Sequence, residues 1–199
     1  MEQIYQSFLD FIAVYGYFAV ALLMAMENAC IPIPSELILG FAGYLIFADQ
    51  MTFTGAMIAG MIGGMVGSIF AYLVGSYGGR KFVDKYGKYF LIKKSHVDLT
   101  QRWFDKYGIR AVFFSRMLPV VRTFISLPAG FARVNFKAFL FYTFAGSLPW
   151  TALILYLGIL FGENWKKLLE IGHEASIIVV IAIIVVIAVY IYRRHKNRF

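Results

Sequence analysis

Long apolar stretches, rather than an alternation of apolar and polar positions, dominate this chain. Residues 175–192 form an uninterrupted apolar run that is long enough to cross a hydrocarbon core of ~30 Å as a helix. Residues 138–162 form a second such run, 53–79 a third that is rich in glycine, and 8–27 a fourth near the N-terminus. The pattern predicts an all-α integral membrane protein in which residues 1–199 make a single membrane domain.

Two further apolar segments do not fit simple membrane-crossing helices. Residues 28–48 and 109–132 are each interrupted by two prolines and carry charged residues. Backbone that is broken at membrane depth is tolerated only where protein or water covers it. We therefore expect each segment to form a re-entrant helical hairpin.

The middle of the chain, residues 80–106, is polar and basic. It holds eight Lys and Arg residues against three Asp, interleaved with aromatic residues of the kind that favour the lipid headgroup region. This pattern predicts amphipathic helices on the cytoplasmic surface, and an RNA-binding arm is the less favoured alternative. The basic sequence RRHKNRF after residue 192 also predicts a cytoplasmic C-terminus. With both segments inside, the hairpin at 109–132 opens to the cytoplasm and the N-terminus is cytoplasmic as well.

Composition and charge agree with a membrane protein and narrow its partners. Of the 199 residues, 60% are hydrophobic and 15% are charged, whereas a soluble domain has about 25% charged residues. The formal net charge is +8, yet all 19 Lys and Arg residues lie at or after Arg80. A cleaved signal peptide needs a basic N-terminal region, so we expect none. Basic residues beside membrane segments are explained by membrane topology and anionic lipid, so we expect no nucleic-acid partner.

Short sequence matches predict that the chain contains two repeats, 8–79 and 107–162. YGYFAV at 15–20 matches YGIRAV at 107–112, and GFAG at 40–43 matches GFAR at 130–133. The topology above makes the first hairpin open outward and the second inward, so the repeats would be inverted. Inverted repeats with broken helices are typical of secondary transporters, whose binding site lies where the two repeats meet.

Ionisable and amide groups flank the proline breaks. They are Glu27, Asn28 and Glu36 around Pro32 and Pro34, and Arg116 and Arg122 around Pro119. Ionisable residues within membrane segments are costly and usually functional. The planar guanidinium of arginine grips a phosphate through two parallel hydrogen bonds. Two carboxylates would balance two guanidiniums, and a carboxylate near an arginine can act as a proton carrier.

A structural alternative stays open, in which these four charged side chains only form buried ion pairs that join the two hairpins. Arg110 and Arg133 lie near the ends of the second hairpin, and we expect both to extend toward the membrane surface. We expect Trp150, beside Pro149, to be a packing residue rather than a ligand.

Three stretches resemble the DedA family, also called SNARE-associated or VTT-domain proteins. They are YGYFAVALLMAMENACIPIPSELILGFAGYL, AGMIGGMVGSIFAYLVGSYGG and FFSRMLPVVRTFISLPAGFARVNFKAFLFYTFAGSLPW, and the resemblance covers about residues 10–165. The resemblance implies lipid movement between leaflets, with essential acidic positions at Glu27 and Glu36 and essential arginines at Arg116 and Arg122. Family members have Asp where this chain has Glu36. Within the family the sequence resembles Gram-positive undecaprenyl-phosphate translocases, although relatives that move phosphatidylethanolamine share the motifs.

The function predicted from the sequence is a flippase for undecaprenyl phosphate, coupled to protons, in the bacterial cell membrane. A general phospholipid scramblase that moves phosphatidylethanolamine and a proton-coupled ion transporter are the alternatives. A membrane enzyme such as a lipid phosphatase is disfavoured, because the three histidines lie away from both hairpins and no acidic cluster has metal-ligand spacing. No metal or cofactor is expected, and the sequence leaves open whether the protein forms a homodimer.

Overall fold

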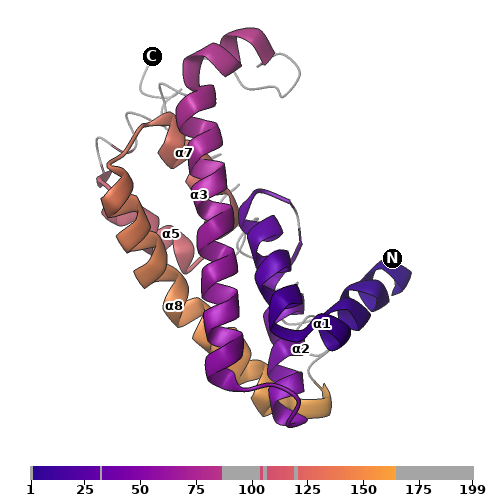
Figure 1. Cartoon of the computed structure of the whole chain (residues 1–199). Coiled ribbons are helices and arrows are strands. Elements are labelled where there is room, and N and C mark those ends of the chain that lie inside the picture. The colour runs from indigo at the N-terminus through magenta and orange to yellow at the C-terminus, as the bar shows by residue number, and fades with distance from the viewer. Residues whose placement is uncertain (1, 32, 87–103, 105–106, 119–120, 165–199) are drawn as a thin grey trace, which may run out of the picture.

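The structure is a computed structural model that describes residues 2–31, 33–86, 104, 107–118 and 121–164 (Figure 1). Its helices are α1 (Glu2–Asn28), α2 (Ser35–Phe47), α3 (Phe53–Tyr86), α5 (Arg110–Arg116), α6 (Val121–Phe124), α7 (Ser126–Phe131) and α8 (Phe136–Phe161), followed by the 3₁₀ turn η1 (Gly162–Asn164). No strand occurs within these ranges, so the all-α class is confirmed. The predicted helix at 175–192, Pro32, Pro119 and most of the basic segment after Tyr86 lie outside the described residues.

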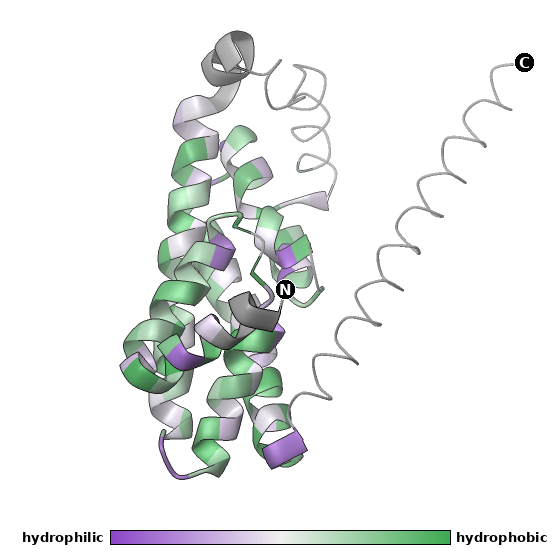
Figure 2. Cartoon of the chain, turned by 90° about the vertical axis from the view of Figure 1, so that its right-hand side faces the viewer, coloured by the Kyte–Doolittle hydropathy of each residue, from purple (hydrophilic) through white to green (hydrophobic). Residues whose placement is uncertain are grey.

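Among the described residues, three helical stretches are long and apolar enough to cross a membrane, namely Leu9–Asn28, Phe53–Gly78 and Phe136–Asn164. Figure 2 shows hydrophobic residues, in green, at many positions along the coloured parts of the long helices. On α3 the side chains of Ile58, Ile62, Val66 and Phe70 recur every four residues and are each more than half exposed. An exposed apolar stripe of this length suits contact with lipid and not with water.

Helix α1 bends sharply at Gly16, which has φ 54° and ψ −127°. Glycine reaches this backbone region without steric cost, and Figure 1 shows the N-terminal part of α1 turned away from the rest. The part of α1 after the bend, 17–28, is about 18 Å long, and the 13 residues of α2 extend about 20 Å. The predicted hairpin segment 28–48 therefore contributes the break at 29–34 and the helix α2, while α1 precedes the break.

Helices α3 and α8 run antiparallel and pack closely on the broken segments through glycine (Figure 1). A Cβ atom at Gly63 of α3 would collide with the carbonyl oxygen of Ala21 in α1. A Cβ at Gly146 of α8 would lie 2.7 Å from the carbonyl oxygen of Phe113 in α5. At both places only glycine permits the backbones to approach this closely.

A second glycine follows twelve positions later on each long helix and contacts the other half of the chain. Gly75 of α3 packs against Gly130 of α7, and Gly158 of α8 packs against the backbone of Gly40 in α2. The four contacts form two equivalent pairs, one pair on each long helix. Each long helix is thus fixed to the broken segment of its own half and to that of the other half.

Two clusters of buried apolar side chains lie along this bundle. The first joins α1, α2, the start of α3 and the end of α8, and the second joins α3, α5, α7 and the start of α8. On α3 the buried Ser68 lies between Ala59 of the first cluster and Tyr72 of the second. A buried polar layer therefore separates the two apolar clusters.

Candidate functional site

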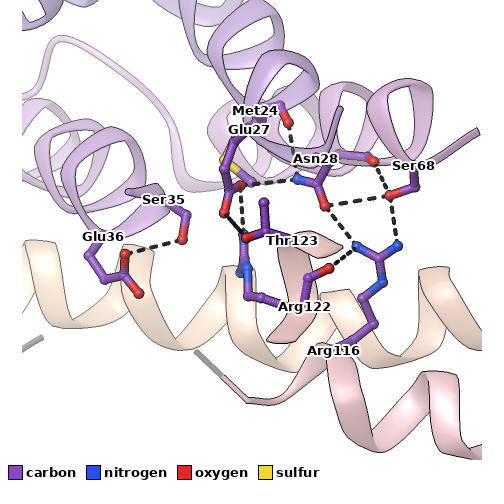
Figure 3. Close-up of polar contacts among 10 residues, drawn as sticks. Met24, Glu27, Asn28, Ser35, Glu36, Ser68, Arg116, Arg122 and Thr123 are labelled. Carbon is purple, nitrogen blue, oxygen red and sulfur yellow. Dashed lines mark hydrogen bonds and ion pairs between the residues drawn. The ribbon is translucent and has the colours of Figure 1, made fainter. Parts of the chain in front are cut away.

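The polar layer is formed where helices end at the breaks. Glu27 and Asn28 are the last two residues of α1, Arg116 is the last residue of α5, and Arg122 lies in α6 after the second break. Figure 3 shows these side chains pointing toward one another, with Ser68 of α3 beside them. The structure thus brings together polar groups that are up to 95 positions apart in the sequence.

Glu27 and Arg122 form a buried ion pair with exposed side-chain fractions of 3% and 6%. Nη2 of Arg122 donates to both carboxylate oxygens of Glu27, at 2.9 and 3.1 Å. The hydroxyl of Thr123 donates to Oε1 at 3.2 Å, and Nδ2 of Asn28 donates to Oε2 at 3.1 Å. The carboxylate therefore accepts hydrogen bonds from three side chains, which compensates for its removal from water.

Arg116 is 1% exposed and bonds to neutral acceptors. Nη1 donates to Oδ1 of Asn28 at 2.7 Å and to the carbonyl oxygen of Arg122 at 3.0 Å. Nη2 donates to the hydroxyl oxygens of Ser68 at 2.9 Å and Ser126 at 2.6 Å. No carboxylate pairs with Arg116 in the part of the chain that the structure describes. Because arginine stays protonated in proteins, the layer holds two positive charges and one negative charge.

Glu36 stands apart from this network. It lies in the first turn of α2, is partly exposed, and accepts a hydrogen bond of 3.4 Å from Ser35 (Figure 3). Pro34, which precedes α2, is exposed. Of the predicted site residues, Glu27, Asn28, Arg116 and Arg122 are brought together, and the expected balance of two carboxylates against two arginines is not seen in this arrangement.

Several residues that contact Glu27 or the arginines were not predicted from the sequence. Thr123 and Ser126 follow Arg122 so closely that their position after the break could have indicated them. Ser68 is one of several hydroxyl residues in the glycine-rich helix α3, and its role depends on how α3 packs. Trp150 was expected to pack only, yet the centroid of its ring lies 5.3 Å from Cζ of Arg122, a cation–π distance.

The arrangement is chemically suited to binding an anion, and it contains an internal carboxylate. Two guanidiniums, three hydroxyls and one amide make up the layer together with Glu27, and two positive charges against one negative charge favour a further anion. Within the described ranges, no group of three or more His, Cys, Asp or Glu side chains could hold a metal ion.

Residues 33–160 of the chain match the VTT domain, which covers more than half of the sequence. The chain belongs to the VTT-domain family. This is the family, also called DedA, that the sequence motifs predicted. Glu36, Arg116 and Arg122 lie inside the matched VTT region, and Glu27 and Asn28 precede it. No solved structure matches this VTT-domain chain.

Related VTT-domain proteins align with the chain over nearly its whole length. Undecaprenyl phosphate transporter A of Bacillus subtilis (strain 168) is 43% identical over 96% of this chain and 94% of its own length. Undecaprenyl phosphate transporter A of Staphylococcus aureus is 30% identical over 97% of this chain and 96% of its own length. A Lactococcus lactis relative, 34% identical over 93% of this chain and 89% of its own length, is named alkaline phosphatase-like protein.

Proposed function

We propose that this chain transports undecaprenyl phosphate between the leaflets of a bacterial membrane, which returns the carrier lipid for cell-wall synthesis. The observation that carries the proposal is the buried pair Arg116 and Arg122, of which Arg116 has no carboxylate partner among the described residues. A phosphate group would supply the negative charge that pairs with Arg116. The names of the Bacillus and Staphylococcus relatives support this choice of substrate.

The depth of the site supports a route through the bilayer. At 1.5 Å per residue, Ser68 is about 22 Å along α3 from Phe53 and about 15 Å from Gly78. The stretch Phe53–Gly78 is long enough to span a hydrocarbon core of ~30 Å, so Ser68 and its partner Arg116 would lie near the middle of the bilayer. The lipid tail would remain in the bilayer while the phosphate reaches this level.

The lengths of the broken helices support re-entrant hairpins around the site. The arm at 17–28 and helix α2 measure about 18 and 20 Å, both less than the ~30 Å of the core. In our proposal they enter from the outer side and α5 to α7 enter from the cytoplasm, so that the two breaks meet at Arg116 and Arg122. The equivalent glycine contacts of α3 and α8 support an inverted-repeat construction. Both chain termini would then be cytoplasmic.

The transport step would be an exchange of anions at the arginines. Glu27 pairs with Arg122, and the phosphate would displace it. A displaced carboxylate in a low-dielectric layer gains a proton readily, which would couple lipid movement to protons. Glu36, which is partly exposed beside the first break, would exchange that proton with water.

The experiment measures how fast undecaprenyl phosphate moves from one leaflet to the other in proteoliposomes, with phosphatidylethanolamine measured in parallel. We expect Arg116→Gln to slow movement of undecaprenyl phosphate at least about tenfold, because a hydrogen bond to a charged group contributes about 1.5–3 kcal/mol. Arg110→Gln is the matched control, since Arg110 is an exposed arginine at the start of α5. Release of inorganic phosphate is measured in the same vesicles to test for hydrolysis.

Three results would contradict the proposal. An unchanged rate in an Arg116→Gln, Arg122→Gln double variant would remove the arginines from the mechanism. Equal movement of phosphatidylethanolamine in the unsubstituted protein would indicate a general scramblase. Proton currents without any lipid movement would indicate an ion transporter.

A further inference from the structure

Four buried polar atoms in the described part of the chain have no hydrogen-bond partner. They are Nε of Arg116, Nε of Arg122, Oγ1 of Thr143 and Nε1 of Trp150. Three of them are N–H groups that can only donate, and the fourth is a hydroxyl that can donate. Buried donors are normally satisfied, and all four of these groups can donate, so an acceptor bound at this place would satisfy them.

The packing of α3 on α8 places Thr143 at the level of the arginine network. The ring centroids of Tyr72 and Phe139 are 4.7 Å apart, and a Cβ at Gly60 would lie 3.2 Å from Cγ2 of Thr151. The helices are antiparallel (Figure 1), so residues that lie opposite each other have numbers with a constant sum, and both pairs give the same sum. In this register Thr143 lies opposite Ser68, which accepts a hydrogen bond from Arg116.

The side chain of Arg116 starts beside the same face of α8. A Cβ at Gly146 would lie 2.9 Å from Cβ of Arg116, so this side chain begins next to Gly146 and extends to Ser68. Thr143 is one helical turn before Gly146 and Trp150 is one turn after it, so all three lie on one side of α8. Trp150 in turn lies over Arg122. The four unpartnered atoms therefore belong to two arginines and to the stretch of α8 that faces them.

We propose that Thr143 and Trp150 are phosphate ligands, which complete with the Nε groups of Arg116 and Arg122 a site that only donates hydrogen bonds. This inference rests on the proposed function and adds two ligand residues that would favour its phosphomonoester headgroup over a phosphodiester. A phosphomonoester carries close to two negative charges and three terminal oxygens at neutral pH. A phosphodiester headgroup, as in phosphatidylethanolamine, has one charge and two such oxygens. Four donors and an excess positive charge suit the monoester.

The test measures binding of farnesyl phosphate, a short polyprenyl monoester, and of its methyl diester to the purified full chain. Thr143→Val removes one donor and keeps the shape of the side chain, and Trp150→Phe removes one donor and keeps a smaller aromatic ring beside Arg122. We expect about tenfold weaker binding of the monoester in each variant and little change for the diester. Inorganic phosphate is tested as a competitor, and we expect it to bind far more weakly because it lacks the apolar chain.

Matched variants separate a ligand from a structural residue. Thr143→Ser keeps the hydroxyl and should bind the monoester within about twofold of the unsubstituted chain. Thr151→Val changes another buried threonine of α8 whose hydroxyl is not among the unpartnered atoms, and should leave binding unchanged. The unfolding temperature of Thr143→Val should not fall, because no hydrogen bond is lost.

Each outcome decides between the two proposals. If the unsubstituted chain neither binds farnesyl phosphate nor moves undecaprenyl phosphate, both the proposed function and this inference are wrong. If the unsubstituted chain binds farnesyl phosphate and moves undecaprenyl phosphate, and Thr143→Val and Trp150→Phe bind farnesyl phosphate equally well, only this inference is wrong. A lower unfolding temperature for Thr143→Val would assign its hydroxyl a structural partner and remove it from the ligand set. Equal competition by inorganic phosphate would overturn the preference for a lipid-linked monoester.

Discussion

The ion pair between Glu27 and Arg122 distinguishes a transport site from a purely structural link between the two broken segments. We consider Glu27→Gln, Arg122→Gln and the double variant. In Glu27→Gln, the buried Arg122 loses its carboxylate and keeps the ring of Trp150 as a neighbour. In Arg122→Gln, Glu27 keeps the donors Thr123 and Asn28. Breaking a buried pair costs about 3–5 kcal/mol, and we expect Glu27→Gln to fall at the upper end.

The double variant removes both charges and should recover much of this loss. A buried pair that is replaced by neutral groups leaves no uncompensated charge. We expect the double variant to cost no more than the worse single variant, so the coupling energy should be at least about 3 kcal/mol, within the range measured for close charge pairs. For a chain of this length, 1 kcal/mol shifts the unfolding temperature by about 2–4 °C. Each single variant should therefore unfold about 6–20 °C lower, as measured by intrinsic fluorescence in detergent.

Transport assays on the same variants then separate the two interpretations. If the pair is only a structural link, the double variant should regain transport together with stability. If Arg122 holds phosphate, the double variant should remain inactive although it is folded. Transport by the double variant at the rate of the unsubstituted protein would refute the role of this pair in transport. A cost below about 1 kcal/mol for Glu27→Gln would refute the assumption that the charge is buried and paired.

Three further predictions follow from single contacts. Gly63→Ala should lower the free energy of unfolding by at least about 2 kcal/mol, because the new Cβ meets a backbone carbonyl of α1. Gly64→Ala is the matched control: the nearest atom to its Cβ is 3.6 Å away, so it should be neutral or stabilise the protein by up to about 1 kcal/mol. Thermal unfolding compares the two variants. Glu36→Gln should change the unfolding temperature by less than about 2 °C, since only one hydrogen bond of 3.4 Å is affected, yet abolish stimulation of lipid movement by an imposed pH gradient; retained stimulation would exclude Glu36 as the proton carrier. Tyr17→Phe removes the hydroxyl that accepts from the backbone N–H of Thr52 at 2.8 Å and should cost about 1 kcal/mol, and an unchanged unfolding temperature would contradict a fixed bend in α1.

The sequence was sufficient to predict the class of the protein and to single out most of the charged residues that the structure brings together. Prolines and ionisable residues are unusual in apolar segments, so Glu27, Arg116 and Arg122 could be recognised as a set before their positions were known. Which carboxylate pairs with which arginine could not be predicted. That choice depends on the end of α1 and the first turn of α2, where Glu27 is buried and Glu36 is partly exposed.

The bend at Gly16 and the role of Ser68 also could not be read from the sequence. Glycine is frequent in membrane helices, so a glycine in an apolar run does not by itself indicate a backbone with positive φ. Gly63 and Gly67 allow α3 to approach α1 closely, which places Ser68 beside Asn28, and Arg116 donates to both residues. A contact that depends on the packing of two helices leaves no signal in the hydropathy pattern of either helix.

The different partners of the two arginines define an order for the proposed exchange. Arg116 is held by neutral oxygens, so a phosphate can pair with it without displacing another anion. Arg122 is paired with Glu27, so a phosphate must compete there with a carboxylate. Asn28 connects the two, because it accepts from Arg116 and donates to Glu27. A phosphate that replaces Asn28 as the partner of Arg116 would free Asn28 to move and so weaken its hydrogen bond to Glu27. Binding at Arg116 would then make it easier for the phosphate to displace Glu27 from Arg122.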